Sequence, residues 1–119
     1  MAVEMEVKAG QPATAVITVS GFVETPQARQ LRKVFDDAEQ QGVGRVIIDI
    51  SKVPFISSTG LSLLVSYSNL KKNEWGQDAV ILVGPAQSVK KAMQILGLTS
   101  LFNILPDMQT AASRFGLTE

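Results

Sequence analysis

The segment Val46-Ile47-Ile48-Asp49-Ile50 constrains the fold more than any other part of the sequence, because four of its five residues are apolar and β-branched. A run without regular apolar–polar alternation suits a central strand that is covered on both faces. Residues 79–83, Ala-Val-Ile-Leu-Val, form a second apolar run. Strands of this kind occur in sheets that helices cover, so the two runs predict an α/β fold.

The N-terminal part of the chain predicts a hairpin followed by a helix. Residues 3–8 alternate apolar and polar side chains. The β-branched residues 15–19 follow a turn at Gly10-Gln11-Pro12, so the two strands are expected to pair. Thr25 is expected to cap a helix whose first residue is Pro26.

Three further helices and a short edge strand complete the predicted order. The helices are expected at residues 58–72, at 87–96 and from 106 or 107 onward, and the edge strand at 101–105. The order β-β-α-β-α-β-α-(β)-α predicts a mostly parallel or mixed sheet of four to five strands with about four helices and right-handed crossovers. We expect residues 1–119 to form one domain.

Hydrophobic periodicity also predicts which side chains are buried. Leu70 is expected on the buried side of the second helix, and Leu96 is expected to point inward from the third. The pairs Lys71-Lys72 and Lys90-Lys91 are expected to be solvated helix surface. Trp75 is expected in a turn after the second helix, folded over the rim of the core. An exposed contact residue is the alternative for Trp75.

Composition excludes several kinds of site. The chain has no cysteine, so it has no disulfide and no zinc–thiolate site. It also has no histidine, which is the commonest general base in enzymes. Eleven basic and eleven acidic residues cancel, so no overall charge attracts nucleic acid or an anionic membrane. Phosphate-binding glycine motifs are absent, and we expect no cofactor and no metal. Without a signal peptide or a long apolar run, the chain is expected to be cytoplasmic and not inserted in a membrane.

The candidate working surface is the turn Ser57-Ser58-Thr59-Gly60 at the start of the second predicted helix. In a purely structural interpretation, Ser57 or Ser58 caps the helix. In a functional one, the unpaired N–H groups and the partial positive charge of the helix start favour a phosphate on Ser58. Such a phosphate would leave the fold intact and disturb a partner surface packed on the turn. Residues 21–25 precede the first helix and are expected at the same edge of the sheet.

A hydrolase that uses Ser57 or Ser58 is the enzymatic alternative. A serine nucleophile needs a base, no histidine is present, and the spacing of Lys52 does not suggest a serine–lysine pair. The aspartates are scattered along the chain, at Asp36, Asp37, Asp49, Asp78 and Asp107. We therefore expect a binding module and not an enzyme.

Residues 47–61, Ile-Ile-Asp-Ile-Ser-Lys-Val-Pro-Phe-Ile-Ser-Ser-Thr-Gly-Leu, resemble the signature of the STAS domain, which is found in bacterial anti-sigma factor antagonists. In that family a strand leads to a turn of the type aromatic-hydrophobic-Asp-Ser-Ser/Thr-Gly-Leu. The first serine of the turn is phosphorylated, and Ser58 corresponds to it. Residues 21–24 similarly resemble the Gly-x-hydrophobic-Asp segment before the family's first helix.

The resemblance implies a partner-switching cycle. The antagonist binds an anti-sigma factor that is also a serine kinase and thereby frees the sigma factor. The kinase phosphorylates the antagonist from ATP and releases it, and a serine phosphatase resets the cycle. Partner contacts are expected at Phe22, Glu24, Phe55, Ile56, Ser57, Thr59, Gly60 and Leu61.

The sequence departs from the family pattern at two positions. Ser57 stands where the family has Asp before the phosphorylated serine, and Glu24 stands where it has Asp in the earlier loop. Because the aspartate is missing, one alternative is an antagonist that is always active and is not regulated by phosphorylation. A second alternative is that Ser57 or Thr59 is modified instead of Ser58. The alternative function is a STAS subunit of another assembly, such as a membrane transporter, that binds its partner whatever the charge at Ser58.

Overall fold

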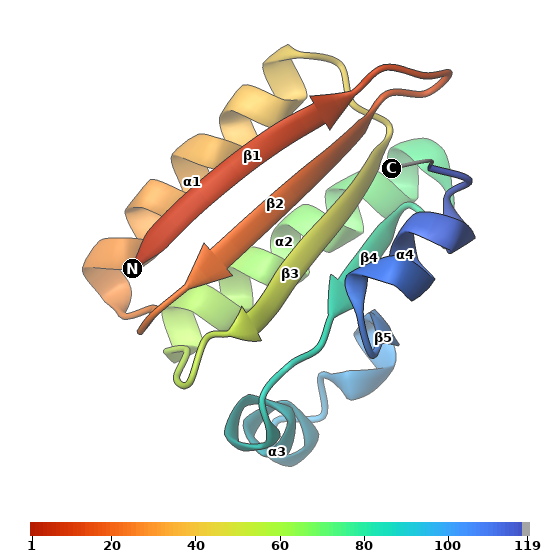
Figure 1. The fold of residues 1–119 in the computed structure, drawn as a ribbon. Helices are drawn as coiled ribbons and strands as arrows, with labels where there is room; N and C mark the ends of the chain where they lie inside the picture. The colour runs from red at the N-terminus through yellow and green to blue at the C-terminus, as the bar shows by residue number, and fades with distance from the viewer. Residues whose placement is uncertain (118–119) are drawn as a thin grey trace.

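Five strands form one mixed sheet in a computed structural model that describes residues 1–117 (Figure 1). The strands are β1 (Ala2–Lys8), β2 (Thr14–Ser20), β3 (Arg45–Lys52), β4 (Val80–Val83) and β5 (Asn103–Leu105), in that spatial order. The β1–β2 hairpin is antiparallel, and every later pair is parallel. The predicted α/β class, mixed sheet and element order are confirmed.

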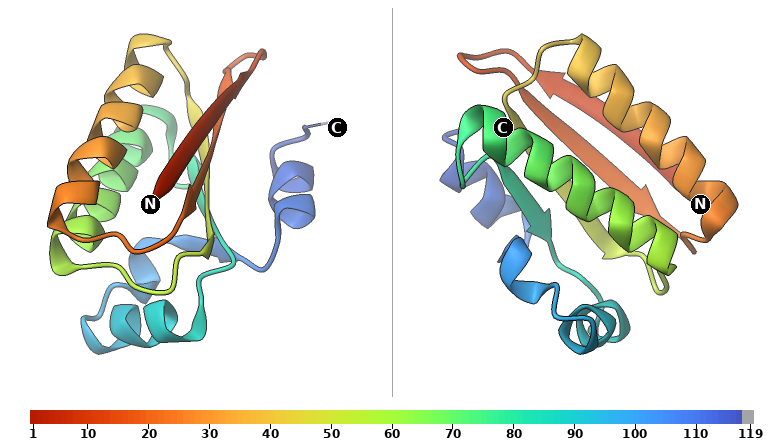
Figure 2. Two further views of the ribbon diagram at one scale, coloured as in Figure 1. Left: turned by 60° about the vertical axis from the view of Figure 1, so that its left-hand side comes forward. Right: turned by 180° about the vertical axis from the view of Figure 1, so that it is seen from behind.

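Helices cover both faces of the sheet. They are α1 (Thr25–Gln40), α2 (Ser58–Trp75), α3 (Gln87–Ile95) and α4 (Met108–Arg114), with a short 3-10 helix at Thr99–Leu101. Helices α1 and α2 lie side by side on one face, and α4 lies on the other (Figure 2). Helix α3 lies near the carboxyl end of β4 (Figure 1).

Strand β3 shows why its sequence lacks alternation. Ile48 and Ile50 belong to the larger core under α1 and α2. Ile47 points the other way and packs with Ala111 and Phe115 from the α4 side. Each of the three isoleucines is at most 1% exposed. The strand is therefore buried on both faces, as its apolar run predicted.

Several predicted element boundaries are wrong by a few residues. Helix α1 is preceded by Glu24 as the N-cap, so Thr25 is its first residue and not its cap; the Glu24 backbone N–H donates to Gln27 Oε1 over 3.1 Å. Helix α2 continues to Trp75 and not only to residue 72, so Trp75 lies in the helix and not in the turn after it. Strand β5 starts only at Asn103, because the 3-10 helix occupies the preceding residues.

Three burial predictions are also wrong. Leu70 and Leu96, expected inside, are 44% and 54% exposed. Lys71, expected in solvent, is 1% exposed. Trp75 is 51% exposed, although a Cβ on Gly44 would lie 2.9 Å from its ring. Each of the two predictions for Trp75 therefore holds in part, because the ring lies close to Gly44 and half of the side chain is in solvent.

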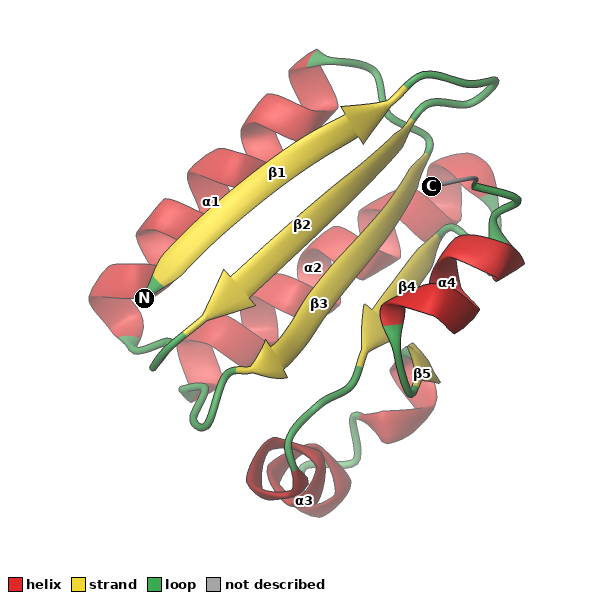
Figure 3. Cartoon of the chain, in the orientation of Figure 1, coloured by secondary structure: helices red, strands yellow, loops and turns green. Residues whose placement is uncertain are grey.

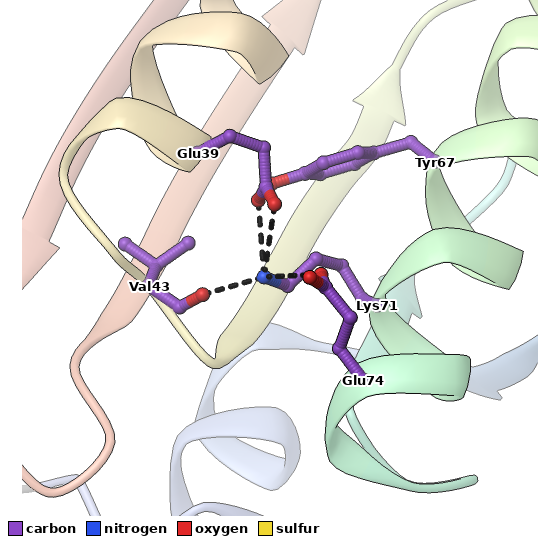
Figure 4. Close-up of polar contacts among 5 residues, drawn as sticks. All are labelled: Glu39, Val43, Tyr67, Lys71 and Glu74. Carbon is purple, nitrogen blue, oxygen red and sulfur yellow. Dashed lines mark hydrogen bonds and ion pairs between the residues drawn. The ribbon is translucent and has the colours of Figure 1, made fainter.

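The buried Lys71 joins the C-terminal end of α1 to α2 (Figure 4). Its Nζ lies 3.0 Å from Glu39 Oε2 and 3.6 Å from Glu74 Oε1, and it donates to the carbonyl oxygen of Val43. The Tyr67 hydroxyl donates to the same Glu39 carboxylate over 2.8 Å. The ammonium group thus loses water but gains oxygen partners, which is the condition for burying a charge.

Candidate partner-binding site

The two segments that the sequence singled out lie together at the carboxyl ends of β2 and β3. Val23 and Ile56 form an isolated parallel bridge beyond the strands. The Val23 N–H donates to the Phe55 carbonyl over 2.9 Å, and the Ser57 N–H donates to the Val23 carbonyl over 2.8 Å. Figure 3 shows the loops that follow β2, β3 and β4 at this end of the sheet. The loop before α1 and the loop before α2 therefore form one hydrogen-bonded surface.

Alternation along these paired loops divides buried from exposed side chains. Val23 and Ile56 are 1% and 6% exposed and belong to the core. Their neighbours Phe22 and Phe55 are 59% and 49% exposed. Two large aromatic side chains in solvent, one on each loop, are the kind of feature that marks an interaction surface.

The first turn of α2 separates the roles of the hydroxyl groups. Ser57 is the N-cap, and its Oγ accepts a hydrogen bond from the Gly60 N–H over 3.2 Å. Ser58 and Thr59 are exposed residues of the first helical turn. Thr25 Oγ1 donates to Thr59 Oγ1 over 3.4 Å, which ties the start of α1 to the start of α2. The structural interpretation thus holds for Ser57, while the Ser58 and Thr59 side chains lie at the surface.

Gly60 is needed for packing inside the protein. A Cβ at this position would lie 2.7 Å from Ile56 Cγ1 and 3.1 Å from Val23 Cγ1. Helix α2 therefore approaches the paired loops more closely than a side chain allows. Ile56, Gly60 and Leu61 are buried in the isolated protein, and their contact with a partner stays a prediction.

The remaining predicted contact residue and the nearby aspartate have different environments. Glu24 is exposed at the start of α1, between Phe22 and the Thr25–Thr59 contact. Asp49 lies within β3, and its Oδ1 accepts from the Ser51 N–H over 2.9 Å. Asp49 thus shapes the end of the strand, whereas Glu24 is a surface charge.

The arrangement offers binding groups and few reactive ones. Within residues 1–117, no group of three or more acidic side chains is placed to hold a metal ion. The surface combines two exposed aromatic rings, one carboxylate and two exposed hydroxyl groups at a helix start. Such a set suits recognition of a protein surface.

A pair of basic residues that the sequence did not point out lies beside this surface. Arg29 and Arg32 of α1 line a hollow of about 290 Å³ that also includes Thr59 of α2. The available signal was the spacing of three residues, which places both arginines on one side of the helix. It could not indicate which neighbour that side meets.

Comparison with known proteins identifies the family. The model of the STAS domain matches residues 4–111, nearly the whole chain. The chain belongs to the STAS domain family. The match includes both paired loops and the turn at the start of α2, so the resemblance carried by residues 47–61 is confirmed.

Individual STAS relatives are distant in sequence and similar in fold. BtrV of Bordetella bronchiseptica, a proposed anti-sigma factor antagonist, is 24% identical over 100 residues, 84% of each chain. The structure of unphosphorylated SpoIIAA, an anti-sigma factor antagonist, superposes with a TM-score of 0.74 at 22% identity, over 99% of this chain and 100% of that one. A proposed antagonist from Thermotoga maritima gives a TM-score of 0.78 at 19% identity, over 92% of both chains.

The phosphorylated form of the Bacillus protein SpoIIAA also superposes on this STAS domain. Its TM-score is 0.69 at 21% identity, over 94% of this chain and 99% of that one. At these identities the similarity establishes the shared fold. Within the described residues of this STAS domain, we find no helix with both the length and the apolar character needed to cross a membrane.

Proposed function

We propose that this STAS domain is an anti-sigma factor antagonist that binds an anti-sigma factor with serine kinase activity and is released by phosphorylation at Ser58. The observation that carries the proposal is the different structural position of the two neighbouring serines. Ser57 caps α2, while Ser58 lies exposed on the first turn, beside the Phe22 and Phe55 loops.

A phosphate on Ser58 would act on the interface and spare the fold. It adds between about 1.5 and 2 negative charges at neutral pH. The N-terminus of a helix favours such a charge, because its first N–H groups are unpaired and carry a partial positive charge. A partner whose surface packs on Phe22 and Phe55 would have to bury the phosphate, which is strongly unfavourable without matching cations.

Two relatives support this account. SpoIIAA is an anti-sigma factor antagonist, and BtrV is a proposed one. SpoIIAA has been solved with and without its phosphate, and this chain superposes on both forms. A fold that exists in both states is what a switch acting through surface charge requires.

Ser57 in place of the family's aspartate changes the kinase substrate and preserves the turn. The serine hydroxyl caps the helix as an aspartate carboxylate would, because both accept from a backbone N–H of the first turn. The turn lacks the fixed negative charge. We therefore expect phosphorylation at Ser58 to be slower than in a variant that carries the aspartate.

Ser58 is preferred over its neighbours as the modified residue. The Ser57 hydroxyl oxygen accepts the cap hydrogen bond, and Ser57 is less exposed than Ser58. Thr59 is exposed but shares a hydrogen bond with Thr25. Thr59 remains the second candidate, and mass-spectrometric mapping of the modified peptide distinguishes the two.

Affinity capture from the native cell lysate tests the proposal. The baits are wild type, Ser58→Ala and Ser58→Asp, with Ser113→Asp as a matched control that places the same charge on the exposed surface of α4. Retention of an ATP-binding serine kinase by wild type, Ser58→Ala and Ser113→Asp, but not by Ser58→Asp, supports the switch. Equal retention of a transporter subunit by all four baits would contradict it and favour a STAS module of another assembly.

A further inference from the structure

A groove runs between the two helices that start at the candidate site. Helices α1 and α2 begin at the same end of the sheet and continue side by side in the same direction (Figure 2, right). The hollow beside their first turns is lined by Thr25, Arg29 and Arg32 from α1 and by Thr59, Ser62 and Ser66 from α2. We call this hollow and its continuation along the helices the α1–α2 groove.

The groove extends well beyond the first turns. A second hollow of about 280 Å³ shares Arg32, Leu63 and Ser66 with the first and continues to Leu70. Leu70 is 44% exposed although the helical pattern predicts it inside. The two hollows follow α2 from Thr59 to Leu70, which is about 16 Å at ~1.5 Å per residue, the length of a short peptide segment.

The end of the groove near the helix starts carries the positive charges of Arg29 and Arg32. Arg29 and Arg32 are exposed, and the ion pairs found among residues 1–117 include neither of them. Asp36 lines only the second hollow, and the Glu39 carboxylate is occupied by Tyr67 and Lys71. Glu24 lies before the helix and is not among the lining residues.

The other lining groups suit a carboxylate attached to an apolar chain. Ser62 and Ser66 lie one turn apart on α2 and expose hydroxyl donors toward solvent. Ala28 and Leu63 add apolar surface to the same hollow. A guanidinium group binds carboxylates in a bidentate manner, and nearby hydroxyls satisfy the remaining lone pairs.

We propose that the α1–α2 groove binds an acidic, partly apolar segment of the protein partner, with its carboxylates at Arg29 and Arg32. The inference rests on the proposed function and names the chemistry of the partner. Thr59 belongs both to the turn and to the groove, so a phosphate at Thr59 would place negative charge beside the carboxylates of the bound segment. Ser58 is one residue away and lines a separate hollow with Leu96 and Leu98, so a phosphate at Ser58 would act from outside the groove.

Nuclear magnetic resonance with a defined peptide tests the groove directly. The probe is a capped hexapeptide Glu-Leu-Glu-Glu-Leu-Glu added to the ¹⁵N-labelled protein, and the control peptide carries Gln in place of every Glu. We expect shift changes in the backbone signals of Arg29, Arg32, Ser62 and Ser66, at least tenfold weaker binding by the double variant Arg29→Gln/Arg32→Gln, and unchanged binding by Lys90→Gln/Lys91→Gln.

Three results would overturn the groove as the acidic site. They are no binding of the acidic peptide, equal binding of the Gln peptide, and shift changes centred on another surface. Lysate capture separates this failure from that of the proposed function. If Arg29→Gln/Arg32→Gln retains the kinase while Ser58→Asp loses it, the switch stands and the groove does not. If Ser58→Asp retains the kinase, the switch fails whatever the peptide shows.

Discussion

The backbone N–H of Ser57 donates to the carbonyl oxygen of Val23 over 2.8 Å, across the gap between the loops that precede α2 and α1. This contact makes the start of α2 part of a continuous surface with the first loop. The N-cap of α2, the exposed Phe22 and the exposed Phe55 are therefore held in one arrangement. In the proposed switch, a charge added at Ser58 would act on this preformed surface.

Removing the cap hydroxyl should destabilise the protein, whereas removing its neighbour should not. Ser57→Ala loses the hydrogen bond to the Gly60 N–H, and we expect the free energy of unfolding to fall by about 0.5–2 kcal/mol. Ser58→Ala should change it by less than about 0.5 kcal/mol, as for other surface positions. Urea denaturation followed by circular dichroism measures both. Equal losses of stability in the two variants would show that Ser57 is not the main cap of α2.

Gly60→Ala should destabilise the isolated protein. The added Cβ would meet Ile56 Cγ1 at 2.7 Å, and overpacking of a core typically costs about 1–3 kcal/mol. Thermal unfolding without any partner present measures the loss, with Ser62→Ala on the exposed side of the same helix as the control. A stable Gly60→Ala that binds no partner would instead place the glycine's role at the interface.

Tyr67 should make the folded protein less stable in alkali. Burial, reinforced by the hydrogen bond to Glu39, raises the pKa of Tyr67 above its usual range. Above about pH 10 the unfolded chain releases the phenol proton and the folded chain keeps it, so the stability due to Tyr67 falls by about 1.4 kcal/mol per pH unit.

The comparison of wild type with Tyr67→Phe isolates this dependence, because the variant lacks only the phenol hydroxyl. Tyr67 is the only tyrosine, so tyrosinate absorbance reports on it alone. We expect that absorbance to rise only as the protein unfolds. Ionisation of the folded protein near pH 10 would contradict the buried hydrogen bond.

Breaking the Lys71 cluster should loosen the contact between α1 and α2. Glu39→Gln removes the carboxylate that accepts from Lys71 Nζ and from the Tyr67 hydroxyl. Hydrogen bonds to charged groups contribute about 1.5–3 kcal/mol, and we expect a loss in that range in urea denaturation. Glu74 lies on the exposed side of the cluster, so Glu74→Gln is the matched control with a smaller effect.

Restoring the family's aspartate should speed phosphorylation. Ser57→Asp keeps a side-chain acceptor for the helix cap and adds the carboxylate that the family turn carries. We expect a faster rate than wild type with the captured kinase and ATP, measured by intact-mass spectrometry. An unchanged rate would mean that the kinase does not read this position.

The fold was predictable because its determinants are local. The apolar run at residues 46–50 and the glycines and prolines between elements sufficed for the element order. The errors lie where tertiary contacts decide. Lys71 looks like helix surface in the sequence, and only the distant Glu39 and Val43 carbonyl make its burial acceptable.

The candidate site was predictable only in part. The sequence offered both Ser57 and Ser58 as the N-cap of α2, because capping depends on backbone geometry that the sequence does not contain. Leu70 and Leu96 are exposed although helical periodicity predicted them to be buried. Periodicity identifies the apolar side of a helix but not how far the rest of the protein covers that side. The position of Arg29 beside Thr59 required the relative placement of two helices.

The central claim is that one negative charge at Ser58 abolishes partner binding while the fold is retained. Isothermal titration calorimetry with the purified partner, for wild type, Ser58→Asp and Ser113→Asp, tests it most directly, with circular dichroism to verify folding. The account predicts that Ser58→Asp binds at least tenfold more weakly and that Ser113→Asp binds like wild type. Equal affinity of folded Ser58→Asp and wild type would contradict it.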